Sequence, residues 1–153
     1  MLRLGVLVLT LVSVGAILAS AGRSSAPAAV QHTCGLTDRQ FLSNFQVQLA
    51  AVGMYGSDYL AGGTDAKEVI GAAREAARVV RTSAPYDPSL LVVRQYAPAM
   101  FLEYGRAVRA RAAGKNASPA MYRSYTISSY VNEVLREAQP GLTAAGCDVS
   151  GLY

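Results

Sequence analysis

Four stretches of the chain, in which apolar residues recur at the spacing of an α-helix, most constrain what it can fold into. They cover about residues 38–60, 65–83, 87–113 and 118–139, separated by short breaks that contain Gly or Pro. No stretch shows sustained two-residue alternation, the pattern of a half-buried strand. Because loops this short favour antiparallel neighbours, the sequence predicts an all-α fold, an up-down four-helix bundle.

Capping signals support these boundaries. Each of the four stretches begins with a helix N-terminal signal. These are the capping boxes Thr37 with Gln40 and Asp65 with Glu68, and the pairs of an N-cap residue and a following proline, Asp87 with Pro88 and Ser118 with Pro119. Gly114 has the place of a C-terminal cap for the third helix. Pro98 falls inside that helix and removes a backbone donor, so we expect a kink near residues 94–96, or a short helix followed by a longer one.

The chain has two cysteines, Cys34 before the first predicted helix and Cys147 after the last. In an up-down bundle of four helices, the start of the first and the end of the last lie at the same end. The topology therefore brings the two thiols together, and we expect them to form a disulfide that closes the bundle.

The first residues have the pattern of a secretory leader. A short start with Arg3 precedes an uncharged apolar run, residues 4–21, that ends in the small residues Ala19-Ser20-Ala21. We expect residues 1–21 to be a cleaved signal peptide, or else an N-terminal membrane anchor, residues 22–33 to be a flexible tether, and residues 34–153 to be the helical domain. The protein is then secreted or held in the cell envelope of a bacterium.

Composition excludes several classes of function. With one His, two Cys and no Trp, the chain cannot supply a multi-His or multi-Cys metal site. The usual nucleophilic triads are disfavoured because the single His lies in the predicted tether. A net charge of +4 is small for a nucleic-acid binder. We therefore expect no metal, no cofactor, no nucleic-acid partner and no enzyme activity, and contact with a membrane only if the leader stays uncleaved.

The nine tyrosines offer one candidate site. A pocket for a flat or hydrophobic ligand, between the third and fourth helices near Pro98, would use Tyr96, Met100, Tyr104, Tyr122 and Tyr125. The alternative is packing at the helix seams, where the ring of a tyrosine is buried and its hydroxyl reaches water.

Arginines offer a second candidate. Arg74, Arg78 and Arg81 follow one face of the second helix and could meet an anionic surface, or could simply form a solvated face. A further basic group at the end of the third helix, residues 106–115, suits the negative end of a helix dipole. Glu103 lies among apolar neighbours and is either a buried acid or an outward-facing residue. His32, in the tether, is expected to face solvent.

The layout of the chain resembles that of small secreted helical proteins of actinobacteria. It consists of an export leader, Cys34, a helical middle, and Cys147 near an aromatic C-terminus at Tyr153. The haemophore-related proteins of mycobacteria share this plan over residues 34–153. The resemblance implies a helical fold outside the cytoplasm and haem as a possible ligand. Because no His lies in the predicted helices, it transfers no binding residue.

These observations predict an exported helical protein that acts as a binding module, with an envelope protein or an anionic surface as partner. The alternative is a secreted carrier of a small molecule, haem-like or lipid, that uses the tyrosine-lined pocket. An enzyme would need a site built from Glu103, tyrosines and arginines alone.

Overall fold

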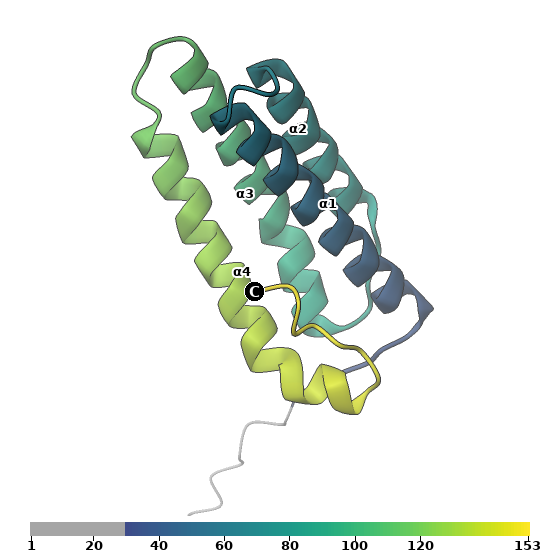
Figure 1. Ribbon diagram of the computed structural model, residues 1–153. Helices are drawn as coiled ribbons and strands as arrows, with labels where there is room; N and C mark the ends of the chain where they lie inside the picture. Colours follow the sequence, from purple (N-terminus) through teal and green to yellow (C-terminus); the bar gives the residue numbers. More distant parts are fainter. Residues whose placement is uncertain (1–29) are drawn as a thin grey trace, which may run out of the picture. The chain divides into compact units, whose positions relative to one another are not determined.

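The computed structural model describes residues 30–153 (Figure 1). The predicted signal peptide or anchor and most of the predicted tether, residues 1–29, lie outside them. Within the described part the chain forms four α-helices and no strand. Their bounds are α1 (Leu36–Leu60), α2 (Ala66–Thr82), α3 (Pro88–Ala112) and α4 (Ser118–Ala144). The predicted all-α fold is confirmed, with four helices close to the predicted positions.

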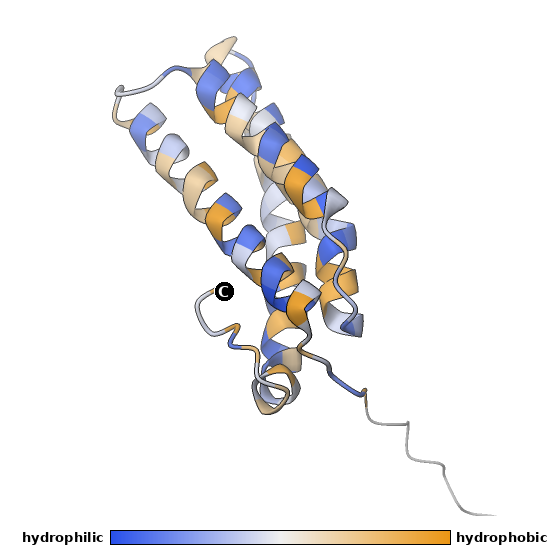
Figure 2. Cartoon of the chain, turned by 90° about the vertical axis from the view of Figure 1, so that its right-hand side faces the viewer, coloured by the Kyte–Doolittle hydropathy of each residue, from blue (hydrophilic) through white to orange (hydrophobic). Residues whose placement is uncertain are grey.

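The helices pack in chain order, α1 on α2, α2 on α3 and α3 on α4 (Figure 1). Hydrophilic and hydrophobic residues are interspersed along the helices (Figure 2). The core holds the rings of Phe41, Phe45 and Phe101 together with aliphatic side chains of all four helices. Val149 and Leu152, which follow α4, are also buried there, so the C-terminal segment belongs to the core.

A disulfide joins Cys34 and Cys147, whose Cα atoms lie 5.6 Å apart although 113 positions separate them in sequence. It confirms the predicted pairing and holds the start of α1 beside the end of α4. The chain after the disulfide continues along α1, where Gly151 lies near Gln46, and reaches α4 through a hydrogen bond from the Tyr153 hydroxyl to Gln139.

Side chains cap α2 and α3 as predicted. Asp65 accepts hydrogen bonds from the amides of Lys67 and Glu68, and Asp87 accepts them from Ser89 and Leu90. Glu68 itself pairs with the Thr64 hydroxyl and does not complete the predicted capping box.

The predicted starts of α1 and α4 are wrong in detail. Thr37 does not cap α1, because the helix begins two residues earlier than predicted, at Leu36, with Gly35 as the N-cap. Asp38 at the third helical position accepts a hydrogen bond from the Gly35 amide. At α4 the N-cap is Ala117, Ser118 is already helical, and its amide donates a hydrogen bond to the side chain of Asn116.

Asp38 also ties α1 to the connection between α2 and α3. Its carboxylate is fully buried and accepts hydrogen bonds from the Tyr86 amide (2.7 Å), the Asp87 amide (3.0 Å) and the Thr33 hydroxyl (3.1 Å), besides that from Gly35 (2.9 Å). Burial alone would raise the pKa of Asp38, but these four hydrogen bonds outweigh it and hold the pKa below its ordinary value.

Asp87, the second fully buried carboxylate, binds the segment before α1. It accepts a hydrogen bond from the Thr33 amide at 2.9 Å and lies 3.0 Å from Nδ1 of His32. The His32 ring rests on Gly141 of α4, where a β-carbon would lie 2.0 Å from the ring. The prediction that His32 faces solvent is wrong, because this notch leaves its side chain only 14% exposed.

Two prolines lie inside helices. Helix α3 continues through Pro98, so it is one helix and not the predicted alternative of a short helix followed by a longer one. The sequence also predicts that the fourth helix stops before Pro140, whereas α4 runs on to Ala144. The last turn of α4 buries Leu142. Gly146, which follows the C-cap, adopts a left-handed conformation with φ +96° and terminates the helix.

Removing the disulfide should destabilise the fold strongly. A Cys34→Ser/Cys147→Ser variant should lose about 4–5 kcal/mol of unfolding free energy, since the cross-link restricts a loop of more than a hundred residues in the unfolded chain. Urea unfolding followed by circular dichroism measures the loss. Reductant should shift the midpoint of the wild type alone, and equal midpoints for variant and wild type would contradict the prediction.

Replacing Asp38 tests the carboxylate separately. Asp38→Asn should cost about 2–3 kcal/mol at neutral pH, because an amide NH₂ would face backbone donors. Folding lowers the pKa of Asp38 below its unfolded value of about 3.9. The carboxylate therefore contributes fully to the unfolding free energy above about pH 5, and this contribution is lost as the pH falls through the lowered pKa. In urea titrations run from neutral to acid pH, the difference in unfolding free energy between wild type and variant should therefore shrink.

Asp58→Asn, at an exposed position of the same helix, is the matched control and should change stability little. A deficit of Asp38→Asn that stays constant down to pH 2 would contradict this role of the carboxylate.

Candidate functional site

The tyrosines proposed for a ligand pocket lie in three different environments. Tyr96 packs edge-on against Tyr130 at the α3–α4 seam, with ring centroids 5.0 Å apart. Tyr104 is half-buried and lies against Gly56 of α1, and burial raises its pKa. Tyr122 and Tyr125 are 72% and 70% exposed on α4.

Met100, the fifth residue of this group, is buried, and its carbonyl accepts a hydrogen bond from the Ser124 hydroxyl. Each of four clefts among residues 30–153 is lined by residues other than these five. The cleft at Pro98 lies between α2 and α3, not between α3 and α4 where the pocket was expected.

Positive charge is concentrated on α2 and α3. These two helices carry eight basic and three acidic residues, whereas α1 and α4 together carry three basic and four acidic ones. Antiparallel packing places the arginines of α2 beside those of α3. The five that line clefts along this seam are Arg74, Arg81, Arg94, Arg106 and Arg109. We call them the α2–α3 arginine face.

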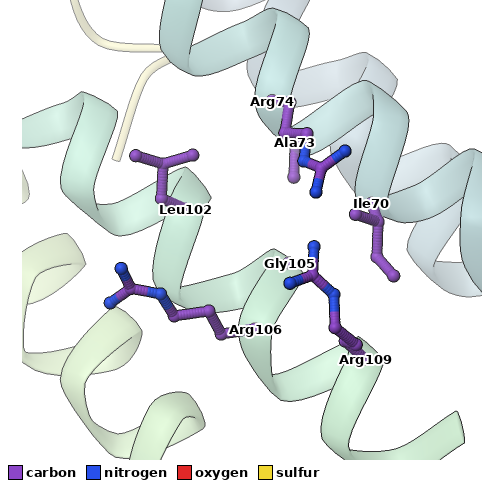
Figure 3. Close-up of a pocket in the computed structure, with 7 residues that line it drawn as sticks. All are labelled: Ile70, Ala73, Arg74, Leu102, Gly105, Arg106 and Arg109. Atoms are coloured by element: carbon purple, nitrogen blue, oxygen red, sulfur yellow. The ribbon is translucent and has the colours of Figure 1, made fainter.

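Toward the start of α2, this seam forms a cleft of about 170 Å³ (Figure 3). Its base is the contact of α2 with α3 at Ala73 and Gly105, where a β-carbon built on the glycine would lie 3.4 Å from that of the alanine. The guanidinium groups of Arg74 and Arg109 point toward each other across the cleft, and that of Arg106 points away (Figure 3).

Nearer the end of α2, a second cleft of about 520 Å³ continues the same seam. Arg81 and Arg94 line it together with Leu91, Pro98 and Leu102. The Nε of Arg94 donates a hydrogen bond to the carbonyl of Arg81, which ties the two helices together at this point. Leu102 lines both clefts, so the arginine face is continuous.

Carboxylates neutralise some arginines and not others. Glu75 binds Arg78, and this hydrogen bond lowers the pKa of Glu75. Glu103 is largely buried and pairs with Arg106 and, across to α4, with Arg123 at 3.0 Å. Of the two readings of Glu103, the buried acid is therefore the one that the structure shows.

The remaining arginines of the face have no acidic partner among residues 30–153. Arg74, Arg81, Arg94 and Arg109 form no ion pair there. Of the predicted surface group, the structure thus places Arg74 and Arg81 at the seam with α3 and occupies Arg78 with Glu75. From the sequence, Arg109 is attributed to the helix dipole and Arg94 is not singled out. The place of both residues on the seam depends on how α2 is aligned with α3, which local sequence patterns do not reveal.

The described residues contain no group of three His, Cys, Asp or Glu side chains placed to hold a metal ion. None of the helices in this part of the chain is long and apolar enough to cross a membrane.

No protein-family model matches the sequence, no curated protein matches it, and no solved structure matches its fold.

Proposed function

We propose that this protein is an exported binding module, not an enzyme, and that its α2–α3 arginine face docks on an anionic membrane surface. This docking does not need the leader, so it departs from the expectation that membrane contact requires an uncleaved leader. The observation that carries the proposal is the set of four arginines without acidic partners, gathered along one helix seam. Export is supported by the leader pattern and by the disulfide, which forms and persists in oxidising compartments.

The shape and composition of the face favour a lipid surface as the partner. Two helices side by side line both clefts with arginines, and Leu91, 42% exposed, lies beside Arg81 and Arg94. Phosphate groups of anionic lipids attract basic residues near the surface, at about 1 kcal/mol each. Four such arginines give a reversible, salt-sensitive attachment of the folded domain.

Sedimentation with lipid vesicles tests this function. The exported form of the protein should bind vesicles containing phosphatidylglycerol, bind phosphatidylcholine vesicles far less, and dissociate as salt is raised. Each of Arg74→Gln, Arg81→Gln and Arg109→Gln should lower the partition coefficient about fivefold.

Arg136→Gln is the matched control, because it removes the same charge from an exposed position on α4. If this variant binds as weakly as Arg81→Gln, net charge and not the arginine face governs attachment. Equal binding to both kinds of vesicle would also overturn the proposal.

A further inference from the structure

We propose that Arg74 and Arg109 form a binding site for one phosphate group in the cleft between α2 and α3. This inference rests on the proposed function and deepens it, since it names the two residues of the arginine face that hold a single headgroup. The rest of the face then contributes long-range attraction only.

The backbone at the base of the cleft brings the two side chains together. Gly105 is buried against Ala73. A β-carbon built on Gly105 would lie 4.0 Å from the Cα of Ile70. These small residues let α3 approach α2 closely, so arginines on both helices reach the same space. Figure 3 shows the guanidinium groups of Arg74 and Arg109 pointing toward each other across the cleft.

The charges around the cleft are unbalanced. Arg106 also lines it, but its guanidinium group is turned away and pairs with Glu103. No carboxylate lines the cleft. Arg74 and Arg109 therefore direct two positive charges at each other, and an anion seated between them would replace this repulsion with two attractions.

The geometry of the donors selects the class of anion. Each guanidinium group is a planar fork that binds two oxygens of one anion. A single fork satisfies the two oxygens of a carboxylate, whereas two opposed forks need the additional oxygens of a phosphate. The cleft, at about 170 Å³, accommodates one such group and leaves the remainder of the ligand outside. Free phosphate supplies four such oxygens, and the phosphodiester of a lipid headgroup supplies two anionic and two ester oxygens, so both offer more acceptors than a carboxylate.

Titration with inorganic phosphate, at constant ionic strength, tests the site. The Nε–Hε signals of Arg74 and Arg109 in ¹⁵N NMR spectra should shift together along one saturating curve. Arg74→Gln and Arg109→Gln should each weaken phosphate affinity at least tenfold. Arg109→Lys, which keeps the charge and loses the fork, should weaken it nearly as much. Arg81→Gln, near the C-terminal end of the same helix, should change phosphate affinity less than twofold.

Two results would overturn the inference. One is a linear, unsaturated shift shared by all exposed arginines, and the other is an Arg81→Gln variant as defective as Arg74→Gln. If either occurs while phosphatidylglycerol vesicles still bind, the proposed function stands without a discrete site. If phosphate saturates the pair but vesicles do not bind, the site takes soluble phosphate and the proposed function fails.

Discussion

Two buried carboxylates at one end of the bundle set the arrangement of everything else. Asp38 of α1 holds the amides of Tyr86 and Asp87, and Asp87 in turn caps α3 and holds Thr33 and His32. The hydrogen bonds that satisfy these carboxylates therefore join the segment before α1 to the start of α3. Since a buried carboxylate is costly without such partners, each hydrogen bond depends on the others being in place.

The disulfide adds the last helix to the same end. It fixes the end of α4 beside Cys34, while the His32 ring sits in the notch at Gly141. With α1, α3 and α4 joined there, α2 is held between α1 and α3, and its register on α3 follows from the close contact at Ala73 and Gly105. That register decides which arginines of the two helices become neighbours. The proposed binding face is thus a consequence of how the two helices pack.

Local signals in the sequence were enough to predict the fold. Helical periodicity, the caps at Asp65 and Asp87, and the paired cysteines predict four helices in the observed order. The predictions that are wrong concern residues whose partners lie far away in the sequence. Gly35 and not Thr37 is the N-cap of α1, and Asp38 is buried there because residues 86 and 87 supply donors for its carboxylate. His32 is buried because Gly141 leaves room for its ring. Arg74 was predicted to belong to a surface-binding group, and it is exposed, but its position opposite Arg109 follows only from the packing of α2 on α3.

Contact of the arginine face with lipid is the central claim, and paramagnetic broadening by a spin-labelled anionic lipid tests it most directly. In phosphatidylglycerol assemblies, the signals of Arg74, Arg81 and Arg109 should broaden most, and those around Tyr122 and Tyr125 on α4 should stay sharp. The strongest broadening at these two exposed tyrosines would contradict the account, because the contact would then be aromatic and would lie on a different helix.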